Sequence, residues 1–255
     1  MIHFNIFGYP LMIHSSGLFY ALGLGGGTAV WWQLAKRAGL EYKRVLDYIF
    51  GILFFGFLGA RLMYVLEFGE HFENVWQRLA FWQGGLVFFG GFIFASIYLV
   101  VQLYISQREK FWQWLDTALM AAVLGQAVGR ISCFLNGDSY GIESRLPWAV
   151  SFPVLGDGVL RHPTQIYEML AYLFIFAVLL YLYQRRKRDG EVLFGGLILY
   201  SLARFLIEFL RYHDSGELLL NNLSYSQLIS LVLLFGGLAG LVYVKKVRLD
   251  IAGRG

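Results

Sequence analysis

Residues 84–106 read GGLVFFGGFIFASIYLVVQLYIS, an apolar run without a single charged side chain. A helix of roughly 20 apolar residues is long enough to cross the hydrocarbon core of a bilayer. The run therefore predicts a membrane-spanning helix. Because its apolar residues are continuous and do not alternate with polar ones, a transmembrane β-barrel is disfavoured.

Six further apolar segments of similar length surround this one, and together they predict seven spans, near residues 17–35, 47–69, 84–106, 112–135, 164–184, 192–211 and 223–244. Hydrophobic residues make up 58% of the chain and charged residues 15%, against about 45–50% and 25% in soluble proteins. This composition excludes a disordered chain and an ordinary soluble enzyme. The net charge of +4 lies in short clusters between apolar blocks, which argues against nucleic-acid binding. We predict an all-α integral membrane protein with a single transmembrane domain over residues 1–255.

Lysine and arginine predict the orientation. They are concentrated after the first, third and fifth predicted spans and in the C-terminal tail, whereas the opposite side carries only Arg78, Arg145 and Arg161. Positively charged loops face the cytoplasm. The N-terminus is therefore expected outside and the C-terminus in the cytoplasm, with a small external cap over about residues 136–163. The first residues lack the pattern of a cleavable signal peptide, so we expect the first span to remain in the mature protein.

Four arginines fall inside predicted spans: Arg61, Arg130, Arg204 and Arg211. Each costs roughly 2.5–3.5 kcal/mol at the bilayer centre before it finds a partner. In the sixth span, Tyr200, Arg204, Glu208 and Arg211 share one helical face, where Glu208 can neutralise one neighbouring arginine. Two interpretations remain open. The stripe is a structural salt-bridge network, or it is an anion site inside the bilayer, where a guanidinium suits phosphate.

Polar residues also gather at the external end of the fourth span. Gln126 and Arg130 lead into GRISCFLNGDSYG, residues 129–141, and RHPTQIYE, residues 161–168, follows the external loop. Pro163 is typical of a helix start. The two segments are interpreted as a binding rim, with a capped helix end and turn as the alternative. His162 is a site residue or a packing residue.

These two segments resemble signatures of the prolipoprotein diacylglyceryl transferase family, a group of bacterial membrane enzymes. Three other segments are similar to family motifs and occur in the same order: GARLMYV at 59–65, WQGGLVFFGG at 82–91 and Tyr200–Arg211. The resemblance covers nearly the whole chain. It implies a seven-span enzyme of the bacterial inner membrane.

The resemblance also implies a reaction. A diacylglyceryl group passes from phosphatidylglycerol to the lipobox cysteine thiol of a preprolipoprotein signal peptide, and glycerol phosphate leaves. This is the first step of bacterial lipoprotein maturation. The implied partners are phosphatidylglycerol and preprolipoprotein signal peptides, with no nucleic acid, metal or cofactor.

The reaction requires a deprotonated thiol and stabilisation of the leaving phosphate. Arg130 and Arg204 are expected to bind the phosphate, supported by Arg61 and Arg211, with Glu208 orienting an arginine. Asp138, His162 and Glu208 are the candidates for taking the thiol proton. The predicted catalytic residues are therefore Arg130, Arg204, Glu208, Asp138 and His162. The predicted phosphatidylglycerol-binding residues are Arg130, Arg61, Asn136, Gly141, Gln165, Tyr167, Tyr200 and Arg211.

The sequence departs from the resembled family at four positions. Ser16 stands where a tyrosine is frequent, Phe89 where a histidine or tyrosine is frequent, Cys133 where an asparagine is frequent and Asp138 where a glutamate is frequent. Phe89 cannot act as a base. Two alternatives are therefore kept: an anion- or lipid-binding membrane transporter, and a catalytically inactive paralogue that binds phosphatidylglycerol.

Overall fold

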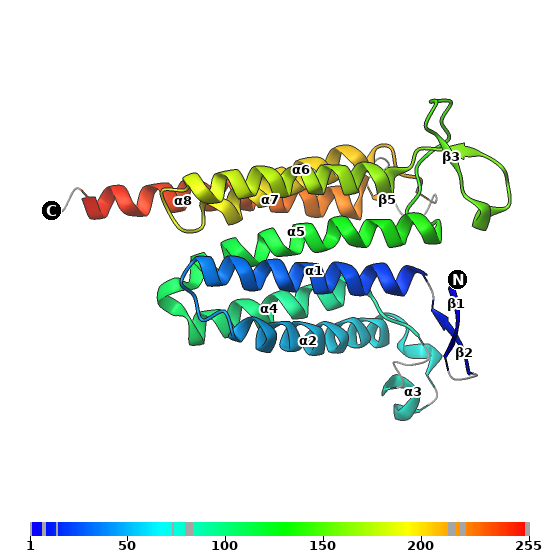
Figure 1. The fold of residues 1–255 in the computed structure, drawn as a ribbon, viewed down its shortest axis with the longest axis horizontal. Coiled ribbons are helices and arrows are strands. Elements are labelled where there is room, and N and C mark those ends of the chain that lie inside the picture. Colours follow the sequence, from blue (N-terminus) through cyan, green and yellow to red (C-terminus); the bar gives the residue numbers. More distant parts are fainter. Residues whose placement is uncertain are drawn as a thin grey trace. The chain divides into compact units, whose positions relative to one another are not determined.

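The structure of the protein is a computed structural model that describes residues 2–6, 9–13, 15–72, 74–79, 84–213, 218–219 and 223–252. These residues are mostly helical (Figure 1). The long helices are α1 (Ser15–Arg37), α2 (Arg44–Glu67), α4 (Phe88–Ser106), α5 (Phe111–Asn136), α6 (Thr164–Arg185), α7 (Glu191–Glu208) and α8 (Tyr225–Ala252). Each of the seven predicted segments overlaps one of these helices.

The short elements lie before α1 and in the connections between the long helices. Among the described residues, the short helices are η1 (Gly69–His71), α3 (Val75–Leu79), η3 (Arg108–Lys110) and η4 (Pro153–Leu155). The described strands are β1 (Ile2–Ile6), β2 (Tyr9–Ile13), β3 (Val150–Ser151), β4 (Leu160–Arg161), β5 (Leu218–Leu219) and β6 (Leu223–Ser224). The strands pair as three antiparallel hairpins, β1–β2, β3–β4 and β5–β6, which the all-helical prediction did not include.

Five helical segments in the described part of the chain are long and apolar enough to cross a membrane: Arg44–Glu67, Phe88–Ser106, Arg108–Asn136, Thr164–Arg185 and Tyr225–Lys246. α1 and α7 do not meet the same criteria. In α7 the reason is its polar content, because Glu191, Arg204 and Glu208 all lie within it.

The predicted sixth span ran to Arg211, but α7 ends three residues earlier, at Glu208. Arg211 instead forms a β-bridge with Gly141, flanked by a hydrogen bond from Ile142 N to Leu210 O (2.9 Å). A side chain at position 141 would collide with His162 and with the backbone of Leu210, so glycine allows this close approach. The i, i+3 spacing of Glu208 and Arg211 continued the helical pattern in the sequence, and it could not reveal this pairing with a distant segment.

The chain divides into two compact units. The first comprises Met1–Trp31 and Leu115–Gly255, and the second comprises Trp32–Trp114. In the second unit, α2 packs along α4. Glycines on both helices permit this contact, because a Cβ atom at Gly59 would lie 2.5 Å from the carbonyl oxygen of Gly90. Small residues at such crossings are typical of helix packing in membranes.

In the first unit, α7 packs against both α6 and α8. The N-terminal part of α1 approaches α5 closely, since a Cβ atom at Gly23 would lie 2.7 Å from the carbonyl oxygen of Gly125. Trp31 Nε1 donates a hydrogen bond to Thr117 Oγ1 at 3.1 Å. The buried Asp116 accepts hydrogen bonds from the amides of Gly190 (2.8 Å) and Leu193 (2.7 Å), so a side chain of α5 caps the start of α7.

Candidate active site

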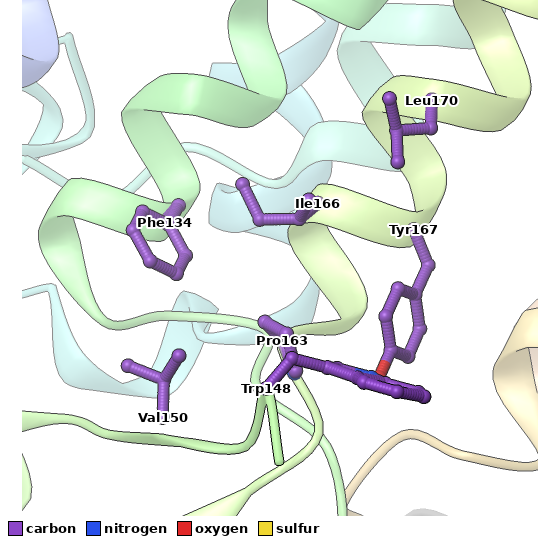
Figure 2. A pocket seen from close by; sticks show the side chains of 7 residues that line it. All are labelled: Phe134, Trp148, Val150, Pro163, Ile166, Tyr167 and Leu170. Carbon is purple, nitrogen blue, oxygen red and sulfur yellow. The ribbon is translucent and has the colours of Figure 1, made fainter. Parts of the chain in front are cut away.

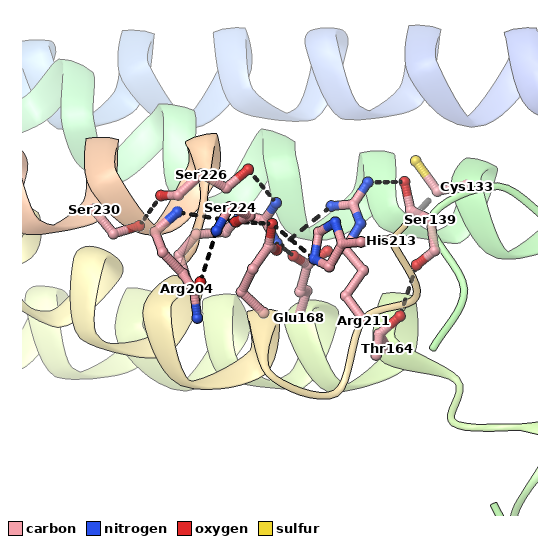
Figure 3. A network of polar contacts seen from close by, with 12 residues as sticks. Cys133, Ser139, Thr164, Glu168, Arg204, Arg211, His213, Ser224, Ser226 and Ser230 are labelled. Carbon is pink, nitrogen blue, oxygen red and sulfur yellow. Dashed lines mark hydrogen bonds and ion pairs between the residues drawn. The ribbon is translucent and has the colours of Figure 1, made fainter. Parts of the chain in front are cut away.

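Glu168 on α6 lies at the centre of a buried polar network in the first unit (Figure 3). Only 1% of this residue is exposed. Its Oε2 atom lies 2.7 Å from Nε of Arg130 on α5, and its Oε1 atom lies 2.5 Å from Nη1 of Arg204 on α7. One carboxylate thus joins arginines from two other helices. Glu168 is the last residue of the RHPTQIYE segment, but it was not among the predicted site residues.

Glu208 is the second carboxylate of the network and lies at the last position of α7. Its Oε2 atom lies 2.7 Å from Nη1 of Arg204, which confirms the expectation that Glu208 neutralises a neighbouring arginine. Ser224 Oγ donates a hydrogen bond to its Oε1 atom at 2.8 Å. His213 Nε2 lies 3.5 Å from the same oxygen, and Arg211 Nη1 lies 3.9 Å from Oε2.

These five charged side chains are called the arginine–glutamate cluster: Arg130, Arg204, Arg211, Glu168 and Glu208. Three arginines against two glutamates leave one positive charge. Arg130 and Arg204 each have a carboxylate within 2.7 Å, whereas the carboxylate nearest to Arg211 among the described ion pairs is 3.9 Å away. Arg211 therefore carries the charge that is least compensated within the cluster.

Arg211 is held by the segment that follows α5. Its Nη2 atom donates a hydrogen bond to Ser139 Oγ at 2.8 Å. Thr164 Oγ1 and Gln165 Nε2, at the start of α6, donate to the carbonyl oxygens of Ser139 and Asp138, both at 2.6 Å. Ser139 has a φ of +60°, which is uncommon for a residue other than glycine. The start of α6 thus fixes a strained turn against Arg211.

The end of α5 supplies the remaining residues on this side. Asn136 is its last residue, and Asn136 Nδ2 donates a hydrogen bond to Asp138 Oδ2 at 3.4 Å. Cys133 Sγ lies 3.8 Å from Nη1 of Arg130 and 3.7 Å from the hydroxyl of Tyr20 on α1. The sulfur of Cys133 therefore contacts the arginine side of the network.

The hydroxyl group of Tyr200, on α7, donates a hydrogen bond to Gln126 Oε1 on α5 at 3.1 Å. Its ring stacks on that of Tyr172, with ring centroids 5.2 Å apart. The predicted site residues Gln165, Arg204 and Glu208 are thus linked with Arg130 and Arg211 in the same unit. The printed contacts of Tyr200 are with Gln126 and Tyr172.

His162 and Tyr167 belong to a neighbouring polar group. His162 Nδ1 lies 3.1 Å from the Tyr167 hydroxyl, which also accepts a hydrogen bond from Trp148 Nε1 at 2.8 Å. Beside them lies a cavity of about 510 Å³ (Figure 2). Its lining is almost entirely apolar and consists of Phe134, Trp148, Val150, Pro163, Ile166, Tyr167 and Leu170.

Arg61 lies in the second unit and is occupied by the backbone there. Its guanidinium donates hydrogen bonds to the carbonyl oxygens of Arg78 (2.8 Å), Gly84 (2.7 Å), Gly85 (3.0 Å) and Gln77 (2.6 Å). Gly84 and Gly85 have φ angles of +89° and +78°, which only glycine adopts readily. These contacts support a role in holding the segment between α2 and α4.

Phe89, also in the second unit, lies at the start of α4 with 41% of its surface exposed. Trp82 and Gln83 of the same motif lie outside the described residues. In the described part of the chain, no three His, Cys, Asp or Glu side chains are grouped so that they could hold a metal ion.

Sequence reasoning missed several members of the described network, among them Glu168, Ser139, Ser224 and His213. A signal for Glu168 was present, since Gln165, Glu168 and Tyr172 are spaced i, i+3 and i+7 and form a buried polar face of α6. His213 lies two residues beyond Arg211 and had no comparable pattern.

Comparison with known proteins gives a consistent result. The sequence matches the family model described as "Prolipoprotein diacylglyceryl transferase" over residues 2–243. It is 34% identical over 249 residues to the phosphatidylglycerol–prolipoprotein diacylglyceryl transferase of Finegoldia magna, covering 96% of each chain. The corresponding protein of Clostridioides difficile is also 34% identical over 249 residues, covering 96% of this chain and 95% of its own. That of Thermotoga maritima is 36% identical over 221 residues, covering 83% and 74%.

Proposed function

The chain belongs to the prolipoprotein diacylglyceryl transferase family, and on this premise we propose that it transfers the diacylglyceryl group of phosphatidylglycerol to the cysteine thiol of prolipoproteins. The acceptor is the lipobox cysteine of the signal peptide, and glycerol phosphate is the leaving group. This reaction is the first step of lipoprotein lipidation.

The single positive charge of the arginine–glutamate cluster is the observation that carries this proposal. The phosphodiester of phosphatidylglycerol is a monoanion, so its charge matches the one that Glu168 and Glu208 leave uncompensated. A fixed guanidinium in a site that excludes water stabilises the negative charge that develops on a leaving phosphate. The cluster is therefore suited to binding one lipid phosphate.

Within the cluster, we assign the direct phosphate contact to Arg211. Ser139 leaves much of its guanidinium fork available, whereas Arg130 and Arg204 each share a glutamate. Arg130 and Arg204 are proposed as flanking groups that strengthen the positive potential at the phosphate. The sequence analysis instead gave the direct phosphate contact to Arg130 and Arg204 and a supporting role to Arg211.

The other predicted lipid-binding residues are assigned around this contact. Asn136 and Gln165 hold the Asp138–Ser139 turn, and Gly141 lets the chain pass close to Arg211. Tyr200 orients Gln126 beside the cluster. The apolar cavity beside Tyr167 is proposed to hold part of an acyl chain, because its lining is almost free of polar groups.

We further propose seven spans in the bacterial inner membrane, within a single transmembrane domain, with about residues 136–163 as a small external cap. The N-terminus is then outside and the C-terminus is cytoplasmic. Single cysteines introduced into a Cys133→Ser background test this orientation. A membrane-impermeant thiol reagent should reach positions 145–160 from outside, and positions 36–44 and 185–188 only from the cytoplasmic side. The opposite labelling pattern would overturn the proposed topology.

The activity is tested with the purified protein in vesicles of phosphatidylglycerol and a peptide containing a lipobox. Mass spectrometry should find a diacylglyceryl group on the peptide cysteine, with one glycerol phosphate released for each peptide. Vesicles of phosphatidylcholine serve as the lipid control. Binding of phosphatidylglycerol without any transfer would support the inactive paralogue instead.

Arg211→Gln tests the phosphate contact. Loss of a charged hydrogen-bond donor should cost about 1.5–3 kcal/mol, which corresponds to a decrease of about 10- to 150-fold in kcat/KM. Arg145→Gln is the matched control, because Arg145 is an exposed arginine in the segment between α5 and α6. An Arg211→Gln variant with unchanged kcat/KM would contradict the assignment.

A further inference from the structure

The hydroxyl group of Tyr172 on α6 is buried beside the arginine–glutamate cluster. None of the residues that the structure describes is a hydrogen-bond partner for it, and the exposed fraction of Tyr172 is 0%. A buried hydroxyl group in this state has given up its hydrogen bonds to water without replacing them, which destabilises the fold. The fold therefore does not need this hydroxyl group, and it is available as a donor to a ligand.

Tyr172 belongs to a layer of uncharged polar side chains that adjoins the charged cluster. Each of three helices carries such a residue one turn from a charged one: Gln126 and Arg130 on α5, Tyr172 and Glu168 on α6, and Tyr200 and Arg204 on α7. The uncharged side chains contact one another, since Tyr200 donates to Gln126 Oε1 at 3.1 Å and its ring stacks on that of Tyr172. In each helix the uncharged residue is the one farther from the segment between α5 and α6.

The two layers are close enough for one ligand to contact both. Four residues of an α-helix correspond to a rise of about 6 Å. Arg130, Glu168 and Arg204 lie near enough to the Tyr172 hydroxyl group to act on it electrostatically. The side chain of Arg130 is 19% exposed and Tyr200 is half-buried, so each layer has a side chain that a ligand can reach. An anion held by the arginines would thus have an uncharged donor about one helical turn away.

The chemical groups of phosphatidylglycerol follow one another in the same order as these two layers. The phosphate is joined to a glyceryl unit that carries two ester groups, and the acyl chains continue from the esters. The ester carbonyl oxygens are uncharged acceptors that lie deeper in a bilayer than the phosphate. A hydroxyl donor one turn beyond the arginines, on the side away from the proposed external cap, is complementary to them.

We propose that the Tyr172 hydroxyl group donates a hydrogen bond to an ester carbonyl oxygen of the diacylglyceryl group. This inference rests on the proposed function of the site. The glyceryl carbon that receives the thiol lies between the phosphate and the esters. Contacts on both sides of this carbon hold it in place for the attack, which is how substrate-binding residues lower a barrier through orientation. The contact also makes the site selective for ester-linked lipids.

Tyr172→Phe isolates this contact, because it removes the hydroxyl group and keeps the ring that stacks on Tyr200. Since the hydroxyl group has no hydrogen-bond partner among the described residues, the thermal unfolding midpoint of the lipid-free variant in detergent should be equal to that of the wild type or higher. A slower reaction in an equally stable protein is the result that a purely structural role would not give.

A pair of lipids tests the contact with the purified full-length protein and a lipobox peptide. One lipid is diester phosphatidylglycerol, and the other is its diether analogue, which has the same phosphate and glyceryl carbon but no carbonyl oxygens. Tyr172→Phe should lower kcat/KM with the diester lipid by about 2- to 12-fold, the effect of one neutral hydrogen bond. With the diether lipid it should match the wild type. The increase in unfolding midpoint that each lipid causes gives a second measurement of the same difference.

The matched control is Tyr183→Phe, which removes a buried hydroxyl group near the opposite end of α6 that likewise has no partner among the described residues. It should retain wild-type rates with both lipids. An unchanged diester rate in Tyr172→Phe would overturn the proposal, and so would an equal loss with the two lipids. If the wild type transfers from neither lipid, the proposed function fails, whereas the binding measurement still decides whether Tyr172 distinguishes the diester from the diether.

Discussion

Arg204 and Glu168 form a buried ion pair between α7 and α6, with Nη1 of the arginine 2.5 Å from Oε1 of the glutamate. Arg204 also contacts Glu208 at 2.7 Å and donates a hydrogen bond to Ser226 Oγ on α8 at 3.1 Å. Its charge is therefore used within the bundle. This leaves Arg211 as the arginine of the cluster that is best able to bind an external anion.

Glu168→Gln should destabilise the protein and slow transfer. The substitution removes the carboxylate that Arg130 and Arg204 share, and breaking a buried ion pair typically costs about 3–5 kcal/mol. Glu143→Gln is a suitable control, because Glu143 is exposed. The free energy of unfolding in detergent and the transfer rate should both fall for Glu168→Gln and recover partly in Glu168→Asp. Wild-type stability in Glu168→Gln would contradict this view of the network.

Arg61→Lys should loosen the segment between α2 and α4. A lysine ammonium is a point charge and cannot reproduce the fork with which Arg61 donates to four carbonyl oxygens. Hydrogen exchange at residues 74–79 and 84–87 should become faster, while exchange within α5–α8 stays unchanged. If phosphatidylglycerol binding weakened and exchange remained slow, Arg61 would instead be a lipid ligand, as the sequence suggested.

Asp116→Asn should destabilise the start of α7. The amide of Gly190 donates to Oδ2 and the amide of Leu193 donates to Oδ1. An asparagine replaces one of these oxygens with an NH2 group, which cannot accept a hydrogen bond. An unsatisfied buried amide costs about 1–3 kcal/mol. Asp189→Asn provides the comparison, because Asp189 is a half-exposed partner of Arg186 at 3.5 Å. Thermal unfolding should separate the two variants, and equal midpoints would argue against the capping role.

Acid should weaken the segment between α5 and α6 through Asp157. Hydrogen bonds from Arg161, at 2.6 and 3.0 Å, hold the pKa of the Asp157 carboxyl below its ordinary value. A lowered pKa stabilises the folded segment at pH values above the unfolded pKa of about 3.9, and this stabilisation is lost as the pH falls through the folded value. Trp148 fluorescence should report the change below about pH 4. Asp157→Asn should show little of it, and an identical acid transition in this variant would exclude Asp157 as the cause.

The sequence predicted the long helices well because continuous apolar runs depend only on local composition. It also predicted that Glu208 pairs with a neighbouring arginine, and the structure identifies Arg204, four residues away on the same helical face, as the nearest one. It could not indicate that Glu168 joins Arg130 to Arg204, since this contact arises only when α5, α6 and α7 pack together.

Arg61 shows the same limit. A buried arginine in an apolar segment suggests an anion, and only the tertiary structure reveals that backbone carbonyls occupy its donors. The β-bridge between Arg211 and Gly141 could not be predicted from the sequence either, because it joins segments far apart in the chain.

The location of Glu168 also bears on how the protein is synthesised. α6 and α7 follow one another in the chain, joined by residues 186–190, so Glu168 and Arg204 can meet as a helical hairpin while both leave the ribosome. Arg130 on α5 is made earlier and must wait for α6 before its charge is balanced. Since an unpaired arginine is costly in lipid, α5 is expected to stay near the insertion machinery until α6 arrives. Membrane insertion of this part of the protein would then depend on the order of its helices.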